Sequence, residues 1–193
     1  MITNDIVFGN VDSNQFQISE LELSARIGHK VSLLNYQKYI EQYNSVARYK
    51  FAYTKLPLLI ENDICNFGDC LVKSYSLSKV LNNCNEAIFV VVTAGIESDR
   101  LIAKANIQNK ADAFILDAVG SAMIESCMDY ICKNLEEKSS CTKRFSPGYS
   151  DFPLEFQHQL LSRLNAESTV GISLSNELLM VPMKSITAVI GVY

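Results

Sequence analysis

The chain has 193 residues, and its 48% hydrophobic content is enough for the core of one compact unit spanning residues 1–193. Its 17 Lys and Arg residues are outnumbered by 21 Asp and Glu residues, and the sequence pI is about 5.2. Binding a nucleic-acid backbone requires a basic surplus that this composition lacks, so nucleic acid is excluded as an expected partner.

The N-terminal residues lack the basic start and apolar run of a signal peptide, and no stretch of about 18 apolar residues occurs. We therefore expect a cytoplasmic protein without a membrane partner. In that compartment, six cysteines favour reduced core residues over a disulfide framework. They are Cys65, Cys70, Cys84, Cys127, Cys132 and Cys141.

The first 60 residues predict a mixture of strand and helix. Residues 6–8 form an apolar run, and a helix is expected from Ser19 to Gly28, where the glycine ends it. Residues 56–60 are apolar but contain Pro57, which favours an edge strand or an extended entry over a central strand. Between these segments, apolar residues recur at helical spacing, which is typical of a face that fills a core or an interface. This face consists of Tyr36, Tyr39, Ile40 and Tyr43.

Residues 76–81 predict a short helix, and residues 87–94 give the strongest strand signal of the chain. The second segment is β-branched and apolar on both faces, as expected of a buried strand. Gly95 ends it, and Ser98 is placed to cap the helix that follows. One glycine without a phosphate-loop lysine predicts an ordinary strand-to-helix turn, with no nucleotide site.

Residues 111–137 form the longest predicted helix. At about 100° per residue, apolar side chains cover most of its circumference, so we expect the helix to be largely buried. The remaining narrow sector carries small residues followed by two carboxylates one turn apart, and the small residues leave room for another group. This sector consists of Ala118, Ser121, Ala122, Glu125 and Asp129.

A polar connector at residues 138–143 leads to a proline-glycine turn. Pro147 presets φ at the second position of the turn, and Gly148 supplies a positive φ at the third. The pattern therefore predicts a type II turn from Ser146 to Tyr149.

Arg144 and Tyr149 project from the sides of this turn. An arginine can hold a carboxylate through two parallel hydrogen bonds, and tyrosine offers a flat apolar face with a polar tip. The residues alone favour two interpretations about equally. Arg144 either pairs with Glu125 or Asp129 and ties the loop to the long helix, or it belongs to one wall of a ligand site.

The C-terminal part predicts one more helix and two strands. Asp151 is placed to cap a helix that ends near Asn165. Residues 172–174 predict a short strand, residues 175–180 a helical turn, and the alternation of residues 186–192 a final strand.

Several catalytic chemistries lack the residues that they require. The cysteine pairs have four intervening residues and do not match zinc spacing. The two histidines, His29 and His158, have no neighbour that makes either a ligand or a base, so we expect both to be surface or structural residues. No C-x-x-x-C-x-x-C or D-x-H-x-x-G pattern occurs, so any cobalt would be held by another polypeptide. We assign no catalytic residue and no metal ligand.

The turn and two later segments carry a family resemblance. Residues 144–149, followed by 153–155, 171–175 and 180–187, resemble the activation domain of vitamin B12-dependent methionine synthase, and more closely its stand-alone relatives. The match is clearer over residues 85–193 than over residues 1–84. The resemblance implies an α+β fold, a single domain in which helices pack against a mixed or antiparallel sheet.

In that family the domain binds S-adenosylmethionine (AdoMet) in a shallow groove. The resemblance places ligand binding at the arginine and backbone of the turn and at a glutamate of the long helix. The full-length enzymes also carry a tyrosine beyond the final strand, and this sequence stops at Tyr193 before an equivalent position. The implied AdoMet-binding residues are Glu125, Arg144, Ser146, Pro147, Gly148 and Tyr149.

The resemblance implies an accessory subunit that supports the reductive remethylation of inactive cob(II)alamin on a partner, a corrinoid-binding methionine synthase subunit. A flavodoxin-like donor supplies the electron and AdoMet the methyl group, with S-adenosylhomocysteine (AdoHcy) released. Positioning and docking are then the contributions of this chain, which is a component of a methyltransferase system. The alternative is a non-catalytic docking or stabilising module for a corrinoid methyltransferase that no longer uses AdoMet.

Overall fold

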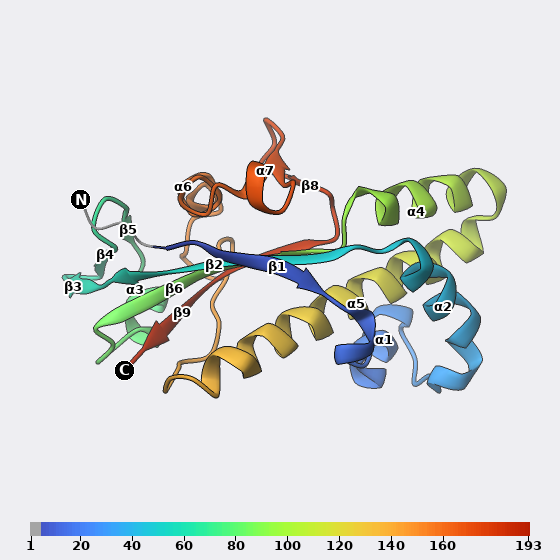
Figure 1. Cartoon of the computed structure of the whole chain (residues 1–193), viewed down its shortest axis with the longest axis horizontal. Helices are drawn as coiled ribbons and strands as arrows, with labels where there is room; N and C mark the ends of the chain where they lie inside the picture. The colour runs from blue at the N-terminus through green and yellow to red at the C-terminus, as the bar shows by residue number, and fades with distance from the viewer. Residues whose placement is uncertain (1–4) are drawn as a thin grey trace.

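The computed structural model describes residues 5–193, and a four-stranded antiparallel sheet runs through its centre (Figure 1). The strand order is β1-β2-β6-β9, so the two strongest apolar segments of the chain, β6 and β9, lie side by side. The architecture is α+β, as expected. The strands are β1 (Val7–Val11), β2 (Tyr49–Pro57), β6 (Glu86–Thr93) and β9 (Ser185–Val192).

β6 is apolar on both faces because each face of the sheet is covered. Successive side chains of a strand point to opposite faces, so its residues divide between two hydrophobic clusters. Ile88, Val90 and Val92 join the cluster on the side of the long helix, whereas Phe89 and Val91 join the cluster on the other side. The predicted buried strand is confirmed.

A layer of four helices lies on one face of the sheet, and α5 makes its contacts with the strands. The 27-residue α5 runs beneath the sheet in Figure 1, and α1, α2 and α4 pack around it. Gly120 of α5 allows close packing, because a Cβ there would lie 2.6 Å from the Tyr43 ring of α2. These helices are α1 (Glu20–Ile27), α2 (Gln37–Val46), α4 (Ile96–Gln108) and α5 (Lys110–Glu136).

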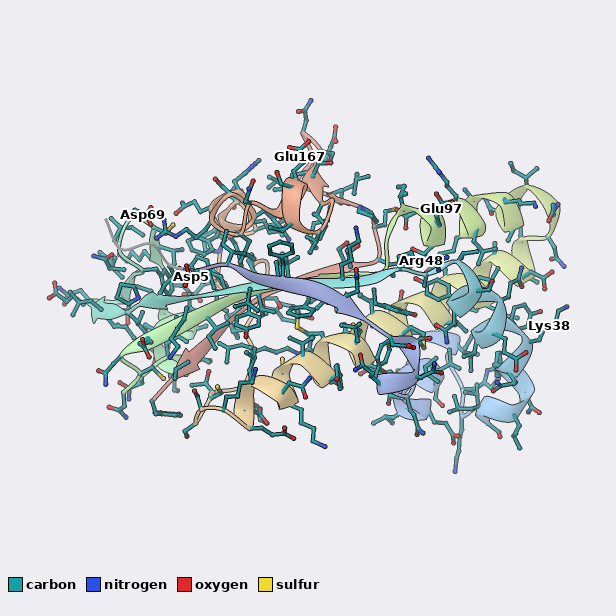
Figure 2. All side chains as sticks on the ribbon, in the orientation of Figure 1. Asp5, Lys38, Arg48, Asp69, Glu97 and Glu167 are labelled. Carbon is teal, nitrogen blue, oxygen red and sulfur yellow. The ribbon has the colours of Figure 1, made fainter. Side chains whose placement is uncertain are left out.

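Shorter elements cover the opposite face. Figure 1 shows α6 and α7 above the central sheet, and α3 belongs to the same layer. In Figure 2 charged side chains such as Glu97 on α4 and Glu167 on α7 lie at the outer surface. The elements of this layer are β3 (Leu59–Glu61), β4 (Ile64–Asn66), β5 (Leu71–Lys73), α3 (Tyr75–Val80), α6 (Phe156–Arg163), α7 (Ala166–Thr169), β7 (Ser173–Leu174) and β8 (Met180–Val181), and single 3-10 turns occur at Ser13–Gln15 and Leu33–Tyr36.

The start and end of a helix were predicted correctly where they depend only on residues near in sequence. The Ser19 hydroxyl accepts a hydrogen bond from the Glu22 amide at 3.2 Å and caps α1, and Gly28 ends this helix with φ of 89°. Ile40 and Tyr43 of α2 are buried, as the helical spacing of that face predicted. All six cysteines are free, four of them buried and two half-buried, which confirms the prediction of reduced core residues.

The interpretation of Pro57 needs correction, because residues 56–57 end the longer strand β2 and residues 59–60 belong to β3. β2 begins at Tyr49 and pairs with β1 on one side and β6 on the other. Pairing with β1 stops at Tyr53, so Pro57 lies where β2 has a partner on one side only and its missing N–H costs no ladder bond.

Two predicted caps are wrong. Ser98 lies inside α4, which begins one residue after Gly95, and its hydroxyl donates to the Gly95 carbonyl at 2.7 Å. Gly95 has φ of 82°, so the chain turns into the helix earlier than the serine predicted. Asp151 caps α3 and not the helix that follows it, because the amides of Tyr75 and Ser76 lie within hydrogen-bonding distance of its carboxylate.

Two further expectations fail for reasons of packing. The predicted helical turn at residues 175–180 is a hairpin loop, since β7 and β8 pair through Leu174 and Met180. The small residues of α5 leave no open space, because Ala118 and Ala122 are buried in the core.

No helix among residues 5–193 is long and apolar enough to cross a membrane.

Candidate functional site

The segment that carries Arg144 is held along the free edge of β9. Phe145 and Val189 exchange both backbone hydrogen bonds, at 2.9 and 2.8 Å, and the Thr142 amide donates to the Gly191 carbonyl at 2.9 Å. The segment thus extends the sheet by an irregular fifth strand. This pairing fixes the direction in which Arg144 leaves the backbone.

The proline-glycine turn has the predicted form. The Tyr149 amide donates to the Ser146 carbonyl at 3.2 Å, and Gly148 has φ of 90°, a conformation that favours glycine. The Gly148 amide also donates to the Phe152 carbonyl at 2.8 Å, so the turn is closed from both sides. The backbone of the loop is therefore organised by its own hydrogen bonds.

Aromatic stacking and a carboxylate anchor this loop to the body of the protein. The rings of Phe145 and Phe152 stack with centroids 6.0 Å apart, and Phe152 is fully buried. Asp151 binds the N-terminus of α3 through the Ser74 hydroxyl at 2.8 Å and two backbone amides. Although desolvation raises its pKa, these hydrogen bonds lower the pKa of Asp151 to about 2.

Arg144 reaches α5 and binds both carboxylates of the polar sector. Its Nη2 donates to Glu125 Oε2 at 2.9 Å and to Asp129 Oδ1 at 3.0 Å. Arg26 of α1 lies 3.4 Å from the other oxygen of Glu125, so this glutamate lies between two arginines. Sequence reasoning missed Arg26, because 99 positions separate it from Glu125 and only the packing of α1 on α5 brings them together.

The structural tie between loop and helix is thus present, and it leaves part of Arg144 free. Desolvation lowers the pKa of Arg144, but the carboxylates of Glu125 and Asp129 outweigh it and raise the pKa, so the guanidinium stays charged. A guanidinium has five N–H donors, and within residues 5–193 only Nη2 has an acceptor. Nε and Nη1 have no acceptor among these residues and can each donate to a further one.

A cleft of about 390 Å³ opens beside this ion-pair cluster. Its volume is within the range of roughly 300–1,000 Å³ that is typical of small-molecule sites. Five of the six predicted binding residues line it, while Gly148 contributes to the turn without lining the cleft. The lining side chains are Glu125, Arg144, Phe145, Ser146, Pro147, Tyr149, Gln157, Met180, Ser185, Ile186 and Thr187.

Gln157 is one of the cleft residues that sequence reasoning did not assign to the site. It lies in the first turn of α6, is only 7% exposed, and its Oε1 has no hydrogen-bond partner within residues 5–193. Leaving such a group unpaired costs on the order of 1–3 kcal/mol. In the sequence this glutamine is one of two in a polar helix segment, and nothing distinguishes it from Gln159.

The chemistry available in the cleft is that of binding. His29 and His158 are exposed, and neither lines the cleft. In the part of the chain that the structure describes, no three His, Cys, Asp or Glu side chains gather in a group suited to a metal ion. The site offers charged groups, an amide and apolar walls.

Comparison with solved structures identifies the fold. No family model matches the chain, and no curated protein matches it by sequence. A solved structure described as the crystal structure of the MetH reactivation domain bound to AdoHcy is similar, with a TM-score of 0.72 at 12% sequence identity. This chain has the reactivation-domain fold. The similarity covers 97% of this chain and 78% of the other, so it extends into residues 1–84, where the sequence resemblance was loose.

Proposed function

We propose that this chain is an AdoMet-binding accessory subunit that supports the reductive remethylation of cob(II)alamin on a partner corrinoid-dependent methionine synthase. The carrying observation is a ligand-sized cleft lined by Glu125, Arg144, Ser146, Pro147 and Tyr149, in a chain with the MetH reactivation-domain fold. The solved domain of that fold binds AdoHcy, the product that AdoMet becomes after losing its methyl group. Residues 1–193 act here as one cytoplasmic unit.

The residues of the cleft fit the charges of AdoMet. The free donors of Arg144 suit the methionyl carboxylate, because hydrogen bonds from a guanidinium to a carboxylate are charge-assisted. Glu125 is the carboxylate that would face the cationic part of the ligand, and its two oxygens lie 2.9 Å from Arg144 and 3.4 Å from Arg26. Pro147 and Tyr149 offer apolar surface.

The proposed reaction requires no proton transfer by the residues of this chain. AdoMet supplies the methyl group, which passes to cobalt on the partner after a flavodoxin-like donor has delivered one electron. The cleft residues position the sulfonium and hold the two ends of the ligand. A general base is not required, in keeping with a cleft whose lining has one carboxylate and one arginine but no histidine.

Exposed apolar side chains near the cleft suit a partner that carries the corrinoid. Tyr149 is 65% exposed, and Met183, in the loop between β8 and β9, is 60% exposed. Tyr149 lines the cleft, and Met180, three residues before Met183, does so too. A corrinoid-binding subunit that covers this surface would bring its cobalt to the mouth of the cleft.

Calorimetric titration with AdoMet and AdoHcy tests the proposal directly. We expect the unmodified protein to bind both ligands and Arg144→Ala to weaken binding by about 10-fold to 100-fold, because charge-assisted hydrogen bonds contribute about 1.5–3 kcal/mol each. Lys143→Ala, in the same segment with an exposed side chain, is the matched control and should bind normally. No binding in the presence of the corrinoid partner would overturn the AdoMet assignment.

One observation favours the alternative, a docking module that no longer uses AdoMet. The carboxylates of Glu125 and Asp129 already neutralise Arg144, so the loop is stable on α5 without a ligand. The two functions separate in an assay that adds this chain to an inactivated corrinoid methionine synthase and a reducing system. Recovery of activity that requires AdoMet supports the accessory subunit, and equal recovery without AdoMet supports the docking module.

A further inference from the structure

We infer that the outer face of the small sheet formed by β3, β4 and β5 is the contact surface of a symmetric dimer of this chain. In Figure 1 this sheet lies at one end of the molecule, and none of the residues that line the cleft belongs to it. The inference therefore concerns a second surface and does not depend on the proposed function.

Large apolar side chains lie on the outer face of this sheet, although its inner face is already buried. Successive residues of a strand point to opposite faces, so Cys65 and Val72 enter the core while their neighbours point outward. A group of exposed apolar side chains on one face is typical of a surface that another molecule covers. The outward apolar residues are Leu59, Ile64 and Leu71, which are 56%, 40% and 58% exposed.

Two turns fix the register of this sheet. Asn62 and Asp63 have positive φ values of 49° and 64°, as in the tight two-residue turn of a hairpin. The Asp63 carbonyl accepts a hydrogen bond from the Ser74 amide at 2.9 Å, and in the second turn the Gly68 amide donates to Asn66 Oδ1 at 2.8 Å. The strands therefore present the outer face in a defined arrangement.

The outward residues form two rows that run across the strands. Residues directly opposite each other point to the same face, so each row has one residue from each strand and a β4 residue at its middle. One row carries an amide between two leucines, and the other an isoleucine between opposite charges. The rows are Leu59-Asn66-Leu71 and Glu61-Ile64-Lys73.

These rows are self-complementary about a two-fold axis that is parallel to β4 and lies between two facing sheets. Such an axis stacks β4 on its own copy and β3 on β5 of the second subunit, and facing sheets do pack with nearly aligned strands. Leu59 then meets Leu71 of the partner subunit, and Glu61 meets Lys73 of the partner subunit. An axis perpendicular to β4 would instead set the apolar row against the charged row, so the pattern selects the first arrangement.

The charges favour a second copy as the occupant of this face. Glu61 and Lys73 are exposed, and neither forms an ion pair with another residue of the described part of the chain. A symmetric contact uses each of them twice and gives two ion pairs of opposite charge. Such pairs set the orientation of a contact more than its strength, and three short strands offer a small area, so we expect a reversible dimer.

Sedimentation analysis with charge-reversed variants tests this arrangement. We expect the unmodified protein to pass from monomer to dimer between about 10 μM and about 1 mM. Glu61→Lys turns both ion pairs into like-charge contacts and should weaken dimerisation by about 10-fold or more. The double variant Glu61→Lys with Lys73→Glu restores opposite charges in both pairs and should dimerise like the unmodified protein.

An apolar variant and its matched control test the middle of the contact. Ile64→Lys sets two lysines against each other on the two-fold axis and should weaken dimerisation by about 10-fold or more. Leu34→Lys changes a leucine outside this sheet that is 85% exposed, and it should dimerise normally. All these side chains are exposed, so thermal unfolding of each variant should stay close to that of the unmodified protein.

Three results would overturn the inference and leave the proposed function standing. An unmodified protein that stays monomeric over the whole concentration range would assign the face to a different protein. Undiminished dimerisation of Glu61→Lys would place the contact elsewhere on the surface. A double variant that fails to recover would show that Glu61 and Lys73 do not meet across the interface.

Discussion

Two basic side chains from the C-terminal part of the chain reach the same row of polar residues on α5, and they do so differently. Lys184 donates to Asp117 Oδ1 at 2.7 Å and to Ser121 Oγ at 2.8 Å, and its side chain is 11% exposed. Arg144 binds the next two residues of the row with one nitrogen, and its side chain is 27% exposed. The row consists of Asp117, Ser121, Glu125 and Asp129, each one turn after the last.

The difference separates a structural contact from the group to which we assign ligand binding. Lys184 is buried and uses two of its three donors, so it fixes the start of β9 to α5 and offers little to a ligand. Arg144 has unused donors and lines the cleft. Similar partners on one helix therefore hold a buried side chain at one position and, at the next, a side chain with free donors beside a cleft.

Replacing Lys184 should have the largest effect on the stability of the protein. Lys184→Met keeps the packed stem and removes two charge-assisted hydrogen bonds, so we expect the free energy of unfolding to fall by about 1–3 kcal/mol. Arg144→Ala should lower it by about 1 kcal/mol or less, because its ion pairs are partly exposed. Denaturant unfolding ranks the two variants by stability, and AdoHcy titration ranks them by binding. Lost binding with full stability in Lys184→Met would contradict the distinction.

Gly148 sharpens the comparison by testing whether the turn positions Arg144. Gly148→Ala places a side chain at φ of 90° and a Cβ 3.2 Å from Leu154 Cδ1. We expect a loss of about 1–2 kcal/mol in the free energy of unfolding and weaker AdoHcy binding. Gly171→Ala is the matched control, because Gly171 also has a positive φ, 77°, with nothing within 4 Å of the added Cβ. It should lose stability but bind normally.

Replacing Asp151 should have the smallest effect on stability, and that effect should depend on pH. Its folded pKa of about 2 lies below the ordinary 3.8, so its stabilisation is present above pH 4 and is lost as the pH falls towards 2. Asp151→Asn should lower the melting temperature slightly at pH 6 and make its fall between pH 4 and 2 shallower. Glu155→Gln, at an exposed carboxyl of the same segment, should leave that slope unchanged. An unchanged slope in Asp151→Asn would show that the contact with α3 does not form.

The sequence predicted the elements of the site better than their contacts. The glycine and proline of the turn, the long helix and the buried β6 were all predicted, because each depends on residues within a few positions. The strand β2 was recognised only at its apolar end, since lysines interrupt its first part, and its register depends on two partners distant in sequence. Its aromatic and threonine residues were the signal that could have revealed it.

The sequence by itself determined where the chain turns and which helix is buried, and its family resemblance supplied the six residues that we propose for ligand binding. Only the tertiary structure decided that Arg26 lies beside Glu125, that Asp151 caps α3 across 77 positions, and that Gln157 enters the cleft from the opposite layer. Backbone preferences act between near neighbours and leave traces in the sequence. Contacts across the sheet follow from strand order and layer packing, which no local pattern contains.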